Sequence, residues 1–227
     1  MKWLIDALTS SLGRKIIMSL SGLFLISFLI VHLSGNLNLL KDDNGATFNV
    51  YSAFMSTNPL IRVLEIGLVV GFALHIYTGI YLLRYNQQAR PIQYAISPKS
   101  EASWFSKNMG LSGIAVLLFL LLHLKNFYWE YHYGDVSTVT IDGKEYKDMY
   151  KITATVFGQW WYTLIYLIAF VLLGFHLNHG FQSAFQTLGL NHVKYNPLIK
   201  GLGTILAFVL PAGFAVVAVV MFLKHMA

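Results

Sequence analysis

Five stretches of mostly apolar residues, each long enough to cross a lipid bilayer, constrain this chain more than any other feature. A spanning helix needs about 20 such residues, and 56% of the chain is apolar while only 11% is charged. The five stretches are Ile16–Leu37, Arg62–Arg84, Met109–His132, Val156–Ser183 and Gly201–Lys224. The sequence therefore predicts an all-α integral membrane protein, with residues 1–227 forming one membrane domain of five transmembrane helices.

The first stretch lies close to the N-terminus, where a signal peptide would stand. No small-residue cleavage site follows it, so we expect a retained helix. An odd number of helices puts the termini on opposite sides, and the excess of Lys and Arg marks the inner side. With the N-terminus inside, the inner segments hold nine Lys and Arg residues and the outer segments six. We expect a multi-pass protein of a bacterial cytoplasmic membrane, with the N-terminus inside and the C-terminus outside.

Two connecting loops have patterns of their own. The outer loop at about 136–149 alternates polar and apolar residues around Asp142–Gly143, which predicts a β-hairpin over the outer face of the bundle. The inner loop Tyr85–Asn108 is long, polar and basic, with Arg90–Pro91 and Ser97–Pro98. It is either a solvated connector or a docking surface for a peripheral partner, and the sequence favours neither.

Composition excludes several classes of function. The chain has no cysteine, which excludes thiolate-ligated iron–sulfur clusters, covalently attached haem and cysteine nucleophiles. The net charge of +6 comes from residues spread over the loops without a binding motif, so we expect no nucleic-acid partner.

Each of the first four stretches contains a histidine deep inside it: His32, His75, His123 and His176. An ionisable side chain at such depth is costly and indicates function. At 1.5 Å per residue, His32 lies ~25 Å and His123 ~22 Å above the inner edge, while His75 and His176 lie ~13 Å and ~15 Å above it. We therefore predict two facing pairs, His32 with His123 and His75 with His176, at levels roughly 10 Å apart. Haem iron is the ligand that best suits two facing imidazoles in an apolar core, and two pairs predict two haems.

Small residues accompany three of these histidines. Gly71 and Gly79 flank His75 one turn away on either side, Gly180 follows His176, and Gly35 follows His32. They either leave room for a macrocycle or allow close packing between helices.

Helical rotation at 100° per residue selects further candidates. Arg14 precedes His32 by five turns and is a candidate to pair with a propionate of the inner haem, and Ser21 shares its face. Glu130 follows His123 by two turns, whereas Lys125 is on the opposite face. Glu130, and Glu65 near the outer end of the second helix, are either proton-exchanging groups at a quinone or interfacial acids.

The other four histidines comprise one alternative ligand and three expected surface residues. His179, three residues after His176, is the alternative fourth ligand, although His176 is the deeper of the two. His132, His192 and His225 stand at helix ends or in loops and are expected at the surface.

The segment Ser11–Lys15, the sequence His32-Leu-Ser-Gly-Asn36, one histidine in each of four helices, and the pair His176 and Gly180 together carry a resemblance. They are similar to the five-helix, dihaem cytochrome b subunits that anchor succinate:quinone oxidoreductases and related fumarate reductases. The resemblance covers all five helices. It implies that the first four helices form a haem-binding bundle holding two haem b groups.

The resemblance also implies a division of labour. A soluble flavoprotein and an iron–sulfur subunit on the inner face would deliver electrons to the inner haem. This chain would pass them to the outer haem and on to a quinone, with menaquinone expected, near the Glu130 region or the loop between Asn36 and Arg62. The dicarboxylate site would lie on the partner flavoprotein.

Three other readings compete with this one. The chain could be the cytochrome b anchor of a hydrogenase or formate dehydrogenase, which its copurifying soluble subunits would reveal. It could be a proton-coupled transporter with histidine relays, although such a protein favours acids near the midplane. It could also be an anchor without a cofactor.

Overall fold

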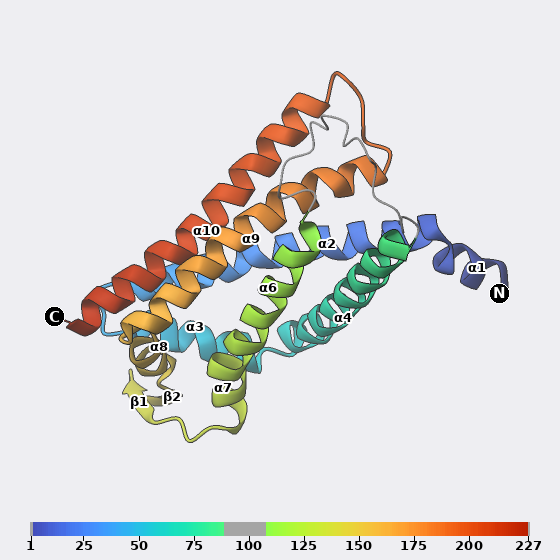
Figure 1. Ribbon diagram of the computed structural model, residues 1–227. Coiled ribbons are helices and arrows are strands. Elements are labelled where there is room, and N and C mark those ends of the chain that lie inside the picture. The colour runs from blue at the N-terminus through green and yellow to red at the C-terminus, as the bar shows by residue number, and fades with distance from the viewer. Residues whose placement is uncertain (1, 89–107, 227) are drawn as a thin grey trace.

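The computed structural model describes residues 2–88 and 108–226. Five of the helices within these ranges are long and apolar enough to cross a membrane, over Ser11–Leu40, Pro59–Gln88, Met109–Tyr133, Trp160–Thr187 and Asn196–Met226. The protein is thus an all-α, multi-pass membrane protein, with the two termini at opposite ends of the bundle (Figure 1).

Each span is built from the following elements. They are α2 (Ser11–Asn36) with the 3₁₀ turn η1 (Leu37–Leu40), α4 (Pro59–Gln88), α6 (Met109–His123) with the π-helical segment η2 (Leu124–Trp129) and α7 (Glu130–Tyr133), α9 (Trp160–Thr187), and α10 (Asn196–Met226). An exposed amphipathic helix, α1 (Lys2–Thr9), precedes the first span.

Capping residues explain why two spans begin earlier than the apolar stretches predict. The Oγ atom of Ser10 accepts a hydrogen bond from the backbone N–H of Gly13 at 3.0 Å, and α2 therefore begins at Ser11 rather than Ile16. The side chain of Asn58 likewise accepts from the N–H of Leu60 at 3.0 Å, and Pro59 suits the first helical position of α4.

The fourth span begins later and ends later than the apolar stretch. Val156 belongs to a separate helix, α8 (Met149–Phe157), and the chain turns before α9 begins at Trp160. At the other end, Gly189 adopts a φ of 78° and the N–H of Leu190 bonds to the carbonyl of Phe185 at 3.0 Å. This C-cap ends α9 at Thr187, four residues past the end of the apolar stretch.

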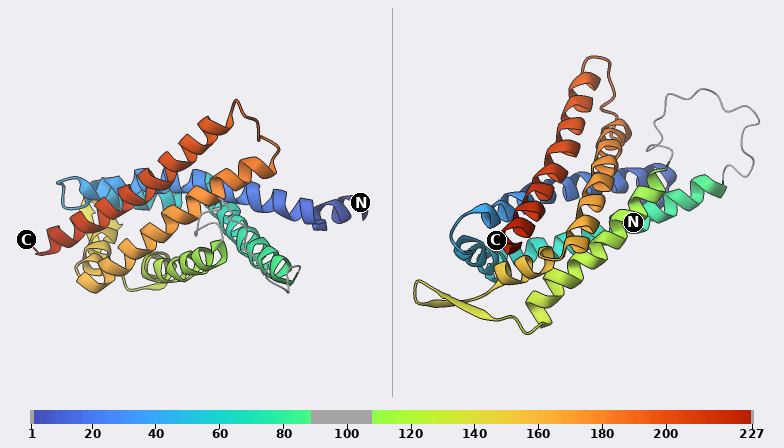
Figure 2. Two further views of the ribbon diagram at one scale, coloured as in Figure 1. Left: turned by 45° about the horizontal axis from the view of Figure 1, so that its top comes forward. Right: turned by 60° about the vertical axis from the view of Figure 1, so that its left-hand side comes forward.

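The four histidine-bearing helices form a four-cornered bundle. Neighbouring corners are α2 with α4, α4 with α6, α6 with α9, and α9 with α2, whereas the backbones of α2 and α6, and of α4 and α9, scarcely approach each other. Helix α10 packs along α9 and also contacts α2, on the side away from α4 and α6 (Figure 2).

A compact cap covers the end of the bundle that contains the C-terminus; we call this the cap end and the other the N-terminal end. The cap consists of η1, α3 (Ala46–Thr57), the hairpin of β1 (Thr138–Ile141) and β2 (Lys144–Lys147), and α8. The hairpin forms in the predicted register, with Ile141 opposite Lys144 and positive φ at Asp142 and Gly143. Helices α3 and α8 are not predicted by the sequence analysis.

One buried side chain connects the parts of this cap. Asn49 of α3 is 2% exposed, donates to the carboxylate of Asp148 at 3.0 Å, and accepts from the N–H of Tyr150 at 2.9 Å. The predicted docking surface around Arg90–Pro91 and Ser97–Pro98 lies outside the described residues.

Candidate functional site

The four deep histidines meet in the two pairs that helix depth predicts. The ring centroids of His32 on α2 and His123 on α6 are 5.7 Å apart, with an interplanar angle of 89°. Those of His75 on α4 and His176 on α9 are 6.2 Å apart, at 74°. Both pairs therefore connect opposite corners of the bundle, where the backbones themselves scarcely approach.

The level of each pair can be placed along α2. Ser21 of α2 contacts His75, so the pair with His176 lies level with residue 21 and the pair with His123 level with residue 32. Eleven helical residues span about 16 Å. The sequence predicts a separation of roughly 10 Å, because it measures the depth of each histidine along its own helix. Here both levels are measured along α2, and the separation is larger.

The spacing within each pair fits one metal ion between two nitrogens. Two imidazoles that share an ion at bond lengths of about 2 Å have ring centroids about 6 Å apart. Within each pair, the two ring planes cross at 89° or 74° and can therefore share one axis that passes through the ion. Haem iron needs only two axial ligands from the protein, because the macrocycle supplies its other ligands. In residues 2–88 and 108–226, no group of three or more His, Asp or Glu side chains is placed to hold a metal.

Two nitrogens of these rings are buried polar atoms without a partner. The Nδ1 atoms of His123 and His176 are inaccessible and make no hydrogen bond within the described part of the chain. Each of the four histidines, taken as a whole residue, is half-buried, although all four lie within helices long enough to cross a membrane. Buried polar groups in proteins are nearly always satisfied, so these two imidazoles are unusual in having no partner at Nδ1 within the described residues.

Glycines adjoin the rings of the pair nearer the N-terminal end. A Cβ atom at Gly22 of α2 would lie 3.2 Å from Cε1 of His75, and one at Gly113 of α6 would lie 3.6 Å from Cε1 of His176. Each ring thus packs against a neighbouring helix at a glycine, which has no side chain. The sequence analysis singles out other glycines, because spacing within one helix cannot show which glycine faces another helix.

Aromatic rings surround the pair nearer the cap. Phe28 stacks on His32 with centroids 5.2 Å apart, and Phe119 and Phe127 lie one turn before and after His123. Phe214 of α10 lies 5.6 Å from His32. These contacts fix the ring orientations in an apolar setting suited to the flat face of a macrocycle.

The alternative ligand His179 lies outside both pairs. The ring in contact with His75 is that of His176, and His179 makes no ring contact among the described residues. The surface histidines expected from sequence are exposed at His192 and His225, whereas His132 is half-buried.

Arg14 and Ser21 of α2 both contact α4. The guanidinium of Arg14 lies 3.8 Å from the ring centre of Tyr81 on α4, a cation–π contact. The Oγ atom of Ser21 lies 3.2 Å from Nδ1 of His75. Both residues therefore face α4, and both lie toward the N-terminal end, where the pair of His75 and His176 is found.

The position of Glu130 corrects a rotational prediction. Sequence analysis puts Lys125 on the face opposite to His123 and Glu130 on the same face, yet the two side chains form an ion pair at 2.6 Å. The reason is the π-helical segment Leu124–Trp129, whose wider turns bring residues i and i+5 together. π-Helical turns are frequent at functional sites, and the sequence carries no clear signal for this one.

Glu130 also lines a cavity of about 430 Å³ between α8 on one side and η2, α7 and residues 135–137 on the other. Its wall contains the polar side chains of Asn126, Ser137 and Lys151 and the apolar side chains of Val136, Ile152 and Val156. Asn126 is three residues from His123, which puts the cavity close to the pair nearer the cap.

Glu65 belongs to a second cluster at the cap end. Its carboxylate accepts from Arg62 at 2.5 Å and from the hydroxyl of Tyr128 at 3.0 Å. His132, stacked on Tyr128, lies 3.5 Å from the Arg62 guanidinium. Sequence analysis places only Glu65 among the candidates.

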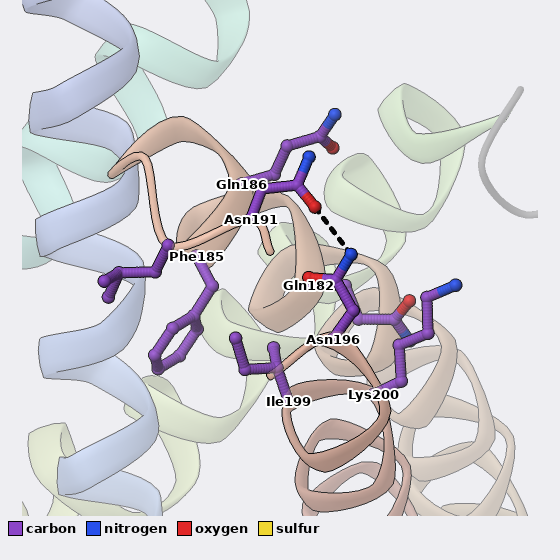
Figure 3. Close-up of a pocket in the computed structure, with 8 residues that line it drawn as sticks. Gln182, Phe185, Gln186, Asn191, Asn196, Ile199 and Lys200 are labelled. Atoms are coloured by element: carbon purple, nitrogen blue, oxygen red, sulfur yellow. Dashed lines mark hydrogen bonds between the residues drawn. The ribbon is translucent and has the colours of Figure 1, made fainter. Parts of the chain in front are cut away.

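A smaller cavity of about 220 Å³ lies at the N-terminal end, in the turn between α9 and α10 (Figure 3). Amide side chains dominate its wall, and Asn196 donates to Asn191 at 2.7 Å. It contains none of the paired histidines.

Comparison with models of known protein families, with characterised proteins and with solved structures finds no match to this chain.

Proposed function

We propose that this chain is the membrane-anchor and electron-transfer subunit of a succinate:quinone oxidoreductase, the family it resembles in sequence. The observation that carries the proposal is the placement of two imidazole pairs on the two diagonals of a four-helix bundle, with centroids 5.7 and 6.2 Å apart. A transporter that relays protons has no need for rings paired at a metal-binding spacing.

His32 and His123 would hold one haem b, and His75 and His176 the other. Bound haem supplies one-electron redox chemistry, and the chain sets its potential through the ligands and their surroundings. Arg14, at the N-terminal end and half-buried, is the cation placed to pair with a propionate of the nearer haem. A separation of about 16 Å between levels suits electron transfer along the bundle.

The direction of transfer follows from topology. With the N-terminus in the cytoplasm of a bacterium, a flavoprotein and an iron–sulfur subunit would dock at the N-terminal end. Electrons would enter at the pair of His75 and His176, and leave from the pair of His32 and His123 to a membrane quinone, with menaquinone the expected one. The dicarboxylate site would belong to the partner flavoprotein.

The cavity beside Glu130 is our candidate for the quinone head group. Its wall combines polar and charged side chains, which could bind the carbonyl oxygens of a head group, with the apolar side chains of Val136, Ile152 and Val156. Glu130 would exchange a proton with the bound quinone, and Lys125 would stabilise its carboxylate form. Glu65, held by Arg62 and Tyr128, is the second candidate for this proton exchange.

A reduced-minus-oxidised visible spectrum of the purified membrane protein tests the proposal. We expect the bands of b-type haem, two haems per chain by pyridine haemochrome assay, and copurification with subunits that oxidise succinate. Copurification with a hydrogenase or formate dehydrogenase instead would keep the haems but reassign the complex. A protein without haem bands would contradict the proposal.

A further inference from the structure

One interhelical hydrogen bond sets a single histidine apart from the other three. Ser21 of α2 is 8% exposed, and its Oγ atom lies 3.2 Å from Nδ1 of His75 on α4, 54 residues away in the chain. By contrast, the Nδ1 atoms of His123 and His176 have no hydrogen-bond partner among the described residues. Ser21 thus contacts one ring of one pair.

The other contact of Ser21 indicates the direction of this bond. Its hydroxyl donates to the carbonyl of Met18 at 3.1 Å, one turn earlier on α2. A hydroxyl has one proton, so a Ser21 that donates to Met18 can accept from Nδ1–H of His75. The second nitrogen of that ring, Nε2, then has no proton and can bind a metal.

The local packing keeps the ring at this place. Gly22 has no side chain, and a Cβ atom there would approach Cε1 of His75 to 3.2 Å, tighter than ordinary contact. Thr78, one turn after His75 on α4, is 3% exposed and its hydroxyl contacts the sulfur of Met18 at 3.4 Å. Helices α2 and α4 are therefore in close contact on both sides of the hydrogen bond.

We propose that Ser21 is a positioning residue, which accepts the Nδ1 proton of His75 and thereby directs Nε2 of that ring toward His176 and the iron between them. The proposal rests on the proposed function, since it requires that His75 bind haem. It assigns Ser21 to the ligand rather than to a propionate. It also makes the two ligands of that haem unequal, because the described residues give no such acceptor to Nδ1 of His176.

A hydrogen bond from the outer nitrogen of a ligating imidazole has two known effects. It makes the metal-binding nitrogen more basic, and loss of such a partner typically weakens metal binding by about 10–100-fold. A more basic ligand stabilises ferric over ferrous iron, and so lowers the midpoint potential. Ser21 should therefore lower the potential of one haem and slow its release.

The test compares Ser21→Ala, Ser21→Thr and Ser19→Ala in the full-length protein purified in detergent. Ser19 is the matched control, because it is 5% exposed on the same helix and, within the described part of the chain, its hydroxyl bonds to the carbonyl of Lys15 at 2.9 Å and to no other helix. The readouts are a potentiometric titration of both haems and the rate of haem transfer to an excess of apomyoglobin. His75→Ala identifies which haem is affected.

For Ser21→Ala we expect a positive shift in the midpoint potential of the haem that His75→Ala removes, with the other haem unchanged, and roughly 10–100-fold faster loss of that haem. Ser21→Thr, which keeps the hydroxyl, should restore both values, and Ser19→Ala should change neither. An unchanged or lower potential in Ser21→Ala, or an equal shift in Ser19→Ala, would overturn the role of Ser21 while leaving the haem proposal intact. A wild-type protein without haem would overturn both.

Discussion

The imidazole of His75 on α4 lies 6.2 Å from that of His176 on α9, measured between ring centroids, although these helices stand at opposite corners of the bundle. Two rings reach the same point from backbones that scarcely approach each other. The same relationship recurs between His32 and His123 at a level about 16 Å away along α2. The repetition makes the pairs, rather than any single histidine, the unit of function.

The cavity beside Glu130 gives the first prediction. Glu130→Gln removes the proton-exchanging group but keeps the size and hydrogen-bonding capacity of the side chain. We expect quinone reduction by the intact complex to fall about 100-fold or more, with the haem spectrum unchanged. The measurement is succinate-dependent reduction of a soluble quinone analogue, normalised to haem.

Glu65→Gln is the matched comparison, since Glu65 is the other carboxylate at the cap end. We expect a smaller effect on turnover, because both of its oxygens are engaged by Arg62 and Tyr128. If Glu65→Gln abolished quinone reduction and Glu130→Gln did not, the quinone site would lie at the cluster of Glu65 instead.

Asn49 gives a prediction about the cap. Asn49→Ala removes two hydrogen bonds of a 2% exposed side chain and leaves the N–H of Tyr150 without that acceptor. We expect the free energy of local unfolding of the cap to fall by about 2 kcal/mol. Limited proteolysis of the hairpin and α8 should accelerate accordingly. Asn38→Ala is the control, because among the described residues the Asn38 side chain bonds to the nearby carbonyl of Gly35 and to no distant segment. Equal acceleration in both variants would contradict the bridging role.

How much of this molecule can be read from its sequence depends on the range of the interactions involved. The pairing of the histidines is predictable, because a rise of 1.5 Å per residue fixes the depth of each ring. The hairpin is predictable, because Asp142 and Gly143 tolerate the positive φ of its turn.

Other features depend on contacts that a linear pattern does not contain. The bond between Ser21 and His75 requires the rotation of α2 relative to α4, which no spacing within α2 reveals. The π-helical segment after His123 shifts the face on which Glu130 lies, so counting turns fails there. Helices α3 and α8 are too short for the spanning criterion, and their place in the cap depends on the long-range contacts of Asn49.

The start of α3 gives a prediction for pH. The Asp43 carboxylate accepts hydrogen bonds from the Thr47 side chain, from the N–H of Thr47 at 2.9 Å and from the N–H of Gly45 at 3.0 Å. These bonds, the Thr47 side chain first, hold the pKa of Asp43 below its usual value of 3.8. A carboxyl whose pKa is lowered on folding stabilises the fold above the unfolded pKa, and this stability is lost as pH falls below 3.8 through the lowered value.

Asp43→Asn tests this dependence. We expect the cap of the wild-type protein to become easier to cleave by an acid-active protease as pH falls from about 5 to 3, in the range where carboxyl groups titrate. The variant should show a flatter dependence over that range. Identical pH profiles of the two proteins would contradict the assignment.

Tyr166 and Tyr162 form a natural pair for a test of the core. Tyr166 is 1% exposed and its hydroxyl has no hydrogen-bond partner in the described part of the chain, whereas the hydroxyl of Tyr162 accepts from Asn126. Tyr166→Phe should leave thermal stability unchanged or raise it, and Tyr162→Phe should cost about 1 kcal/mol. Thermal denaturation followed by circular dichroism distinguishes the two. A large loss in Tyr166→Phe would show that its hydroxyl has a partner in the membrane.

The most direct measurement of the central claim is haem stoichiometry and potentiometric titration of four single variants: His32→Ala, His75→Ala, His123→Ala and His176→Ala. Exposed His192, replaced by Ala, is the control. We predict two haems in the control, and one in each variant. His75→Ala and His176→Ala should lose the same haem, and His32→Ala and His123→Ala the other. Loss of the same haem in His32→Ala and His75→Ala, or two haems retained in any of the four variants, would contradict the account.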